Sequence, residues 1–346
     1  MWQVVGHEDI VALLDKSLVK QMLSHAYLFV GPPQVGKMSL AINLAQGINC
    51  LDYSPSGPCG ECDQCRRIAE GHHSDVQTID LLPNQSGSGT SVEVHIDQIR
   101  EVQHYATLKP FEGRCRVFIF KEASSLSQAS SNAMLKLLEE PPESVLFILL
   151  TTSRELMFPT IVSRCQSVDF KPVPLDTIEQ HIRDVLGIST QEAGNLSRLS
   201  KGRIGWALEA AKDPQIVADY TTELARMGSV LGGTLEERFA YAGELASLFV
   251  RDREQVLDRL RLTVGWWRDM LVLKNGNMKF VSNIPAMESL EGCSHWISTR
   301  QVIEAIKRTW DTMACLRGNV NPRMALEVLM LSLPRNEHQY RLKTTN

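Results

Sequence analysis

Short apolar runs of strand length alternate with helical patterns through the first 170 residues and then stop, and this change strongly constrains the fold. The runs are AYLFV at 26–30, VQTID at 76–80, RVFIF at 116–120 and VLFILLTT at 145–152. Helical patterns such as MSLAINLAQGI and SNAMLKLLEE lie between them. Apolar strands that alternate with helices are typical of a parallel sheet covered by helices on both faces. The sequence therefore predicts an α/β domain over residues 1–170.

The chain after Phe170 is predicted to be helical. KPVPLD at 171–176 is a proline-marked linker, and no convincing strand pattern follows it. Helical periodicity predicts a small domain over residues 171–212 and a larger all-α domain over 213–346.

Composition and charge exclude several classes of protein. The formal net charge is −4, so no global basic field would draw the chain to nucleic acid. The N-terminus lacks a basic patch followed by an apolar run, and VLFILL is too short to span a bilayer. We therefore expect a cytoplasmic protein without a membrane partner. In that compartment, eight cysteines indicate thiol chemistry or a metal rather than disulfides.

Four of the cysteines form a compact C-x8-C-x2-C-x2-C array: Cys50, Cys59, Cys62 and Cys65. Four thiolates at this spacing can close a tetrahedron around Zn²⁺, and a closed four-cysteine site is structural rather than catalytic. The sequence predicts a small zinc-bearing module over residues 50–65. The alternative is four unrelated thiols.

The stretch GPPQVGKMSL at 31–40 follows the first strand and opens a helix, as a phosphate-binding loop does. Gly31, Gly36 and Lys37 occupy the required positions, so ATP or ADP is a candidate ligand. The residue after the lysine should carry a hydroxyl for Mg²⁺, but it is Met38. The pattern leaves open a second interpretation, in which the loop is a structural turn that binds nothing.

A second magnesium contact is also missing. An NTPase needs an acidic residue at the end of a later strand, but RVFIF is followed by Lys121 and then by a single acidic residue, Glu122. We therefore expect no Mg²⁺ at this site and no hydrolysis by this chain. The alternative is an active ATPase in which Ser39 and Glu122 replace the lost ligands.

The tripeptide SRC at 163–165 follows the last apolar strand and carries Arg164. The order of phosphate loop, acidic-strand position, apolar strand and SRC resembles that of oligomeric AAA+ ATPases. The motifs SHAYLFVGPPQVGK, GPCGECDQC, GHHSDV, SNAMLKLLEEPP and IVSRCQ are similar to those of bacterial clamp-loader subunits of DNA polymerase III. NVNPRMALEVLMLSL at 319–333 is similar to the end of their collar domain.

The resemblance implies an AAA+ domain with a zinc module, then a helical lid and a helical collar. Met38, Lys121 and Gly205 replace residues that the ATP-hydrolysing gamma/tau subunits use, although Arg203 lies close to the lid position. Loss of these residues together with retention of SRC resembles the delta-prime class of subunit. For that class the resemblance implies a stator in a five-subunit ring with gamma/tau and delta. Arg164 would then act in trans at a neighbouring ATP site, and the sliding clamp and primer-template DNA would be met through the assembly.

Two other functions remain open from the sequence. An active gamma/tau-like clamp-loader ATPase would use Ser39 and Glu122 as described above. A zinc-bearing DNA-binding protein is the more remote alternative, because residues 50–65 contain few basic side chains.

Overall fold

The computed structural model describes residues 2–54, 57–83, 92–318 and 320–335. The chain forms two compact units, Met1–Leu208 and Glu209–Asn346. The predicted boundary near residue 170 falls inside the first unit, so the division into α/β domain, lid and collar stays a prediction.

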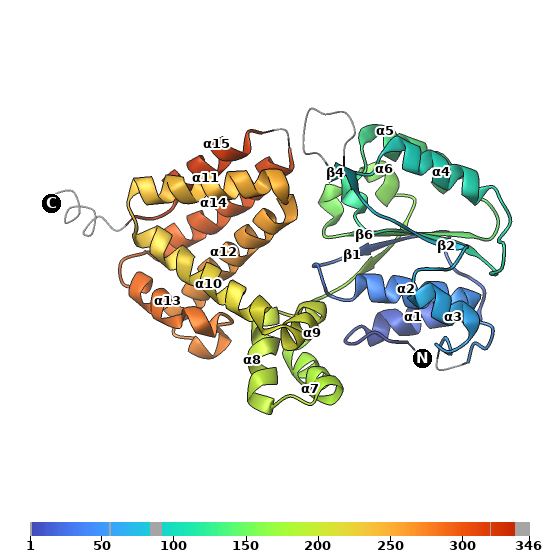
Figure 1. Cartoon of the computed structure of the whole chain (residues 1–346), viewed down its shortest axis with the longest axis horizontal. Coiled ribbons are helices and arrows are strands. Elements are labelled where there is room, and N and C mark those ends of the chain that lie inside the picture. Colours follow the sequence, from blue (N-terminus) through green and yellow to red (C-terminus); the bar gives the residue numbers. More distant parts are fainter. Residues whose placement is uncertain (1, 55–56, 84–91, 319, 336–346) are drawn as a thin grey trace. The chain divides into compact units, whose positions relative to one another are not determined.

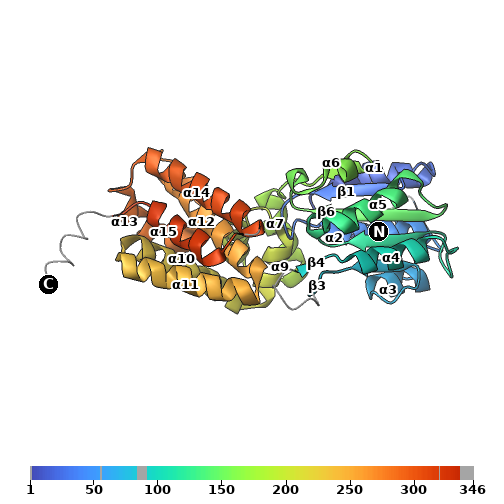
Figure 2. The same cartoon turned by 90° about the horizontal axis from the view of Figure 1, so that it is seen from above.

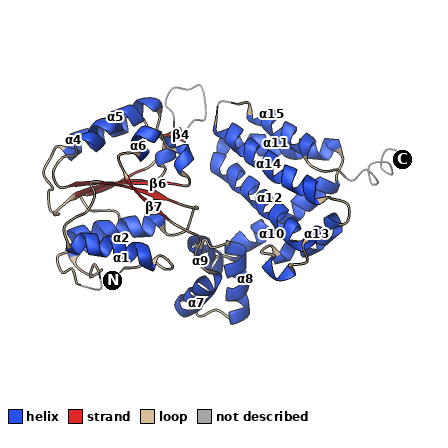
Figure 3. Cartoon of the chain, turned by 180° about the vertical axis from the view of Figure 1, so that it is seen from behind, coloured by secondary structure: helices blue, strands red, loops and turns tan. Residues whose placement is uncertain are grey.

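A five-stranded parallel sheet forms the centre of the first unit (Figure 3). Its strands lie in the order β2 (Val76–Ile79), β5 (Arg116–Phe120), β6 (Val145–Thr151), β1 (Ala26–Val30) and β7 (Gln166–Asp169). A separate antiparallel pair joins β3 (Leu82–Pro83) to β4 (Val92–Glu93). The four apolar runs become β1, β2, β5 and β6. The sequence does not reveal β7, because only Val168 of this edge strand is buried and no apolar run marks it.

Helices cover both faces of the sheet (Figure 1). One face carries α1 (Glu8–Val19), α2 (Lys37–Asn49) and α3 (Asp63–Ala69), and the other carries α4 (Ile96–Ala106), α5 (Gln128–Glu139) and α6 (Pro159–Val162). Between the sheet and the second helical layer, Phe118 of β5 stacks on Phe147 of β6 with ring centroids 5.7 Å apart. Met134 and Leu138 of α5 belong to the same buried cluster. The predicted α/β class is confirmed.

Short helices follow the sheet in the first unit. They are α7 (Leu175–Leu186), α8 (Thr190–Ser200) and α9 (Ile204–Lys212), the last of which reaches the boundary with the second unit. α7 buries Ile178 and Ile182, which lie one turn apart on the same side of the helix. Single 3₁₀ turns, η1 (Ala123–Ser125) and η2 (Arg154–Leu156), follow β5 and β6.

The described part of the second unit is helical (Figure 2). Its α-helices are α10 (Pro214–Gly232), α11 (Leu235–Arg251), α12 (Arg253–Lys274), α13 (Met287–Ser294), α14 (Thr299–Arg317) and α15 (Pro322–Ser332). Two 3₁₀ turns, η3 (Met278–Phe280) and η4 (Ile284–Ala286), join α12 to α13. Trp266 and Trp267 of α12 are fully buried and meet edge to face, so both are core residues. Within the described ranges, no helix is long and apolar enough to cross a membrane.

A buried arginine holds two helix ends together in the second unit. Arg238 of α11 is 1% exposed, and burial lowers the pKa of its guanidinium to about 10, with a smaller contribution from Arg335. The guanidinium remains charged at neutral pH and donates to carbonyls at the ends of α10 and α15. These carbonyls belong to Val230, Leu231, Met330, Leu333 and Pro334. The last carbonyls of a helix have no partner within the helix, and Arg238 donates to such groups at both helix ends, although the Val230 carbonyl also accepts from the Gly233 N–H.

We expect Arg238→Met to lower the free energy of unfolding by about 3–5 kcal/mol, because it leaves several buried carbonyls without a donor. Chemical unfolding of the full chain, followed by tryptophan fluorescence, measures the loss. Arg226→Met is the matched control, since Arg226 forms an ion pair with Glu244 at the surface of the same unit. Such an exposed pair contributes only about 0–1 kcal/mol. Equal effects of the two substitutions would contradict the assignment.

Candidate functional site: a degenerate phosphate loop, an exposed arginine and a four-cysteine cluster

The phosphate loop connects β1 to α2, as predicted, and two glycines determine its shape. Gly36 has φ 111°, a conformation that L side chains rarely adopt. At Gly31 a Cβ atom would lie 2.5 Å from the carbonyl oxygen of Phe170, so only glycine fits between the loop and the chain that follows β7. The two glycines of the motif are therefore required by the fold itself, whether or not a phosphate binds.

The lysine of the motif bonds to its own loop. The Lys37 ammonium donates to the carbonyl oxygens of Gly31 and Pro32, the latter at 2.6 Å, and the residue is 9% exposed. Burial lowers the pKa of Lys37 to about 8, and the negative charge of Glu122 acts against this shift. Carbonyls of the loop thus take hydrogen bonds that a bound phosphate would otherwise accept.

The ends of three strands converge on the loop. The Gly31 N–H donates to the carbonyl of Thr151 at the end of β6 (3.1 Å), and Glu122 follows β5 closely enough to influence Lys37. This convergence is expected, because parallel strands end at the same edge of a sheet. Lys121 forms an ion pair with Asp80, which follows β2, at 2.5 Å. The position directly after β5, where an NTPase has an acidic magnesium ligand, therefore carries a lysine paired with a carboxylate.

A backbone hydrogen bond joins the lid position to the loop. The N–H of Gly205, in the first turn of α9, donates to the carbonyl of Gln34 (2.9 Å). A Cβ at Gly205 would lie 3.1 Å from that oxygen, so any larger residue would require the two segments to shift by a few tenths of an ångström. Arg203 contacts the Ser200 carbonyl (3.0 Å) and lies over the Trp206 ring. The contact between Gln34 and Gly205 could not be read from the sequence.

Arg164 follows α6 and is partly exposed. Its side chain is 35% exposed and forms an ion pair with Glu139, the last residue of α5, at 2.6 Å. Its Nη1 also donates to the Thr160 carbonyl (3.0 Å) and to the Ser163 hydroxyl (3.3 Å). The described contacts of Arg164 are thus with α5 and α6, whereas those of Lys37 are with the phosphate loop. The sequence gives no sign of the pairing with Glu139, since 25 residues and a strand separate the two side chains.

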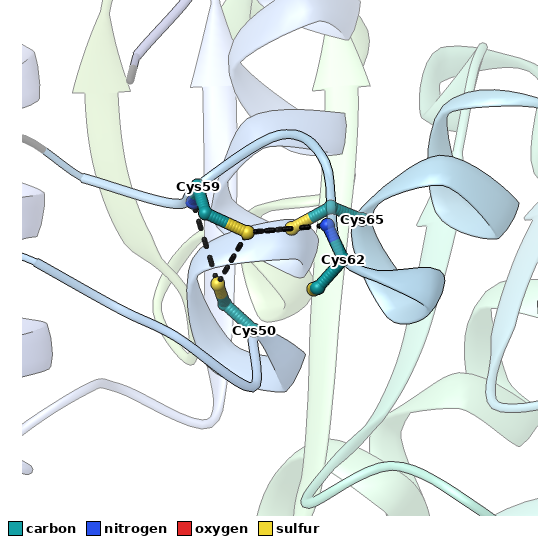
Figure 4. Close-up of side chains that lie close together, drawn as sticks. All are labelled: Cys50, Cys59, Cys62 and Cys65. Carbon is teal, nitrogen blue, oxygen red and sulfur yellow. Dashed lines mark hydrogen bonds between the residues drawn. The ribbon is translucent and has the colours of Figure 1, made fainter.

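The four cysteines of the array come together in space (Figure 4). Cys50 follows α2, Cys59 lies in the loop, Cys62 precedes α3, and Cys65 is in its first turns. All four sulfur atoms lie within 4.8 Å of one another, with 3.5 Å between Cys50 and Cys59 and 4.0 Å between Cys59 and Cys65. A tetrahedral Zn²⁺ with bonds of about 2.3 Å keeps its sulfur ligands about 3.8 Å apart. The cluster therefore fits a zinc ion.

The surroundings of the thiols also suit a metal. Backbone N–H groups of Cys59 and Cys62 point at the sulfur atoms of Cys50 (3.4 Å) and Cys59 (3.3 Å), which would stabilise thiolates. Burial alone acts in the opposite direction and raises the pKa of Cys65 and of Cys50, so a metal would have to displace the protons of these two thiols. Burial also pushes the pKa of Cys62 upward, but hydrogen bonds from the Leu51 and Cys65 backbones outweigh it and bring the pKa to about 7.

Comparisons with known proteins agree with these features. The family described as "DNA polymerase III, delta subunit" matches residues 6–174. The chain is 29% identical, over 97% of its length, to DNA polymerase III subunit tau of Bacillus subtilis, of which it covers 62%. It is 41% identical, over 55% of its length, to subunit tau/gamma of Haemophilus influenzae, of which it covers 26%. Subunit delta-prime of Bacillus subtilis is 26% identical over 94% of this chain and 95% of its own length. Residues 6–174 thus match the DNA polymerase III delta-subunit family, and the chain as a whole is similar to DNA polymerase III clamp-loader subunits.

The resemblance to clamp-loader subunits expected from the sequence is thereby confirmed, and the structure confirms the α/β fold of the first unit. The chain spans less than two thirds of the tau and tau/gamma relatives, covering 62% and 26% of them. The activity of these full-length relatives can therefore only be proposed for this chain.

Two buried polar residues bind the segment that leads into β5, and one of them, Asn49, adjoins the cysteine module. Asn49, directly before Cys50, accepts from the N–H groups of Arg114 (2.8 Å) and Cys115 (3.0 Å) and donates to the Cys115 carbonyl (3.1 Å). Asp75 pairs with buried Arg116 at 3.2 Å. It also accepts from the N–H groups of the preceding loop, at Phe111, Glu112 and Gly113. The sequence motif GHHSDV contains Asp75, but only the structure reveals its partners.

The same motif contains His72 and His73, which follow the four cysteines in the sequence. His73 is buried, and its Nδ1 accepts from the Asp75 N–H at 3.0 Å while its Nε2 bonds to Gln64 of α3. Its contacts thus lie in the connection between α3 and β2 rather than at the sulfur atoms.

Proposed function

We propose that the chain is a delta-prime-like clamp-loader subunit that does not hydrolyse ATP. In this proposal it serves as a stator and donates Arg164 to an ATP site on a neighbouring gamma/tau subunit during sliding-clamp loading in DNA replication. The observation that carries the proposal is the end of β5, where a magnesium-binding carboxylate is needed. Lys121 stands there and pairs with Asp80, and Met38 offers no hydroxyl at the start of α2.

The chemistry of the surrounding residues supports this proposal. Met38 offers no oxygen to Mg²⁺, and Lys121 brings a positive charge to the strand end where a carboxylate is needed. Gly205 contributes a backbone N–H but no side chain to the loop. A catalytic contribution of this chain should therefore occur in trans, at an ATP site on another subunit, because the Arg164 guanidinium can act there without a metal ion bound to its own chain.

Exposed apolar side chains in the second unit support assembly with other subunits. Met324, Val328 and Leu331 of α15 are 62%, 61% and 46% exposed and recur at the spacing of one helical face. A run of this kind is typical of a protein interface. We propose that gamma/tau and delta subunits cover such surfaces in a hetero-pentameric ring. The assembled ring, rather than this chain alone, would then bind the sliding clamp and primer-template DNA.

We also propose that Cys50, Cys59, Cys62 and Cys65 hold one structural Zn²⁺. A closed set of four thiolates leaves no open position for a substrate or a water molecule. The ion would fix the segment between α2 and α3 and would take no part in nucleotide chemistry.

We expect the purified chain to show no magnesium-dependent ATP hydrolysis above background. Calorimetric titration with ATP and ADP, with and without Mg²⁺, should show that Mg²⁺ does not strengthen whatever binding remains, because the metal has lost its ligands. A gamma/tau protein measured in parallel is the positive control.

The second candidate function, an active ATPase, rests on Glu122, whose negative charge reaches Lys37. If that function is correct, the chain hydrolyses ATP, and both Lys37→Ala and Glu122→Gln abolish the turnover. This result would contradict the stator proposal.

A further inference from the structure

The sequence motif SNAMLKLLEEPP suggests no chemical role by itself. In the structure, its first glutamate, Glu139, contacts Arg164, the arginine proposed to act in trans. Glu139 Oε1 lies 2.6 Å from Arg164 Nη2, and the two side chains are 51% and 35% exposed. The neighbouring Glu140 is exposed as well, but no ion pair of Glu140 is found among the described residues. The contact is therefore a property of Glu139 and not of the acidic pair as a whole.

Both ends of this contact are fixed by the core. α5 ends at Glu139, before Pro141 and Pro142, and its residue Leu138 is buried in the main cluster. α6 contributes Ile161, fully buried in the same cluster. Helix α5 also presents the negative end of its dipole at Glu139, which favours a cation there. The guanidinium thus lies between two elements whose positions relative to each other do not depend on it.

The contact leaves part of the guanidinium available. An arginine side chain has five N–H groups, and the described bonds to Glu139, Thr160 and Ser163 use three of them. A phosphate on another chain could therefore be bound without breaking the pair with Glu139.

We propose that Glu139 is a positioning residue for Arg164, which holds the guanidinium in the orientation used in trans. This inference rests on the proposed function of Arg164. A free arginine side chain samples many rotamers, and the fraction of time it spends in the productive one limits the rate at the partner site. An exposed ion pair contributes little to folding, so removal of Glu139 should act on the rate and not on stability.

The test uses the complete clamp loader reconstituted with variants of the full chain. Glu139→Ala should lower kcat for ATP hydrolysis about three- to tenfold at unchanged KM, because orientation is lost while ATP binding belongs to the other subunit. Glu139→Gln should restore a rate within about twofold of the wild type, since the amide oxygen still accepts from Nη2. Glu140→Ala is the matched control and should leave the rate unchanged.

A double-mutant cycle separates this role from any other role of Glu139. Arg164→Ala combined with Glu139→Ala should be no slower than Arg164→Ala alone, because Glu139 acts only through the guanidinium. A slower double variant, or a Glu139→Ala loader as fast as the wild type or faster, would overturn the positioning role and leave the role of Arg164 standing. An Arg164→Ala loader with an unchanged rate would overturn both.

Discussion

We expect Arg164→Ala to slow hydrolysis at the neighbouring gamma/tau site by a factor of roughly 10³, because the charge that develops on the transferred phosphoryl group loses its guanidinium partner. The chain should fold and assemble as before, since Arg164 is partly exposed and its only ion pair among the described residues is with exposed Glu139. Single-turnover hydrolysis of loader-bound ATP measures the effect, since the slowed site then appears as a phase of its own.

Two further variants sharpen this test. Arg164→Lys keeps the charge but not the planar fork of donors, so it should recover only a small part of the rate. Arg154→Ala is the matched control, because Arg154 also forms an ion pair at the surface of the first unit, with Asp169 at 2.6 Å. It should behave as the wild type. If the Arg164→Ala loader assembles normally and every phase of ATP hydrolysis keeps its rate, Arg164 does not act at the neighbouring ATP site.

Removal of the metal should produce the second large effect. We expect about one zinc per chain, held by the four cysteines. Structural zinc sites in small peptides contribute an apparent binding free energy of about 10–16 kcal/mol near neutral pH, and this energy appears as folding energy. Chelation or Cys62→Ala should therefore lower the melting temperature of the full chain by about 10 °C or more. Calorimetry together with metal analysis measures both quantities.

The loss should spread beyond the cysteines because of one neighbouring contact. Asn49, next to Cys50, holds the backbone that enters β5 through Arg114 and Cys115. A loosened module therefore disturbs an interior strand of the sheet. Cys315→Ser is the control, since Cys315 is exposed and lies outside the cluster. A protein that is free of metal and melts at the unchanged temperature would refute the zinc assignment.

Local patterns predicted much of the fold. The apolar runs identified β1, β5 and β6, because buried parallel strands must be apolar on both faces. The run VQTID also identified β2, although this edge strand has no fully buried residue. The same reasoning could not find β7, an edge strand that buries only Val168. The cysteine cluster was predictable because its four ligands lie within 16 residues of one another, so short turns suffice to bring them together.

The contacts that restrain the site were not predictable in this way. The pair of Glu139 with Arg164, the packing of Gly205 on Gln34 and the bonds of Arg238 to the ends of α10 and α15 all join distant parts of the chain. Arginine and lysine side chains have many rotamers and can reach several partners. Their choice depends on where the helices and strands finally pack.

The sequence by itself determined which chemical groups this chain lacks and which it can offer. No packing gives the side chain of Met38 an oxygen or makes Lys121 an acidic metal ligand, and four cysteines at this spacing remain able to bind a metal. Only the tertiary structure decided how the remaining groups are used. It turned Lys37 onto its own loop and brought Glu139 to Arg164, because side-chain direction follows from the packing of whole elements and not from local sequence.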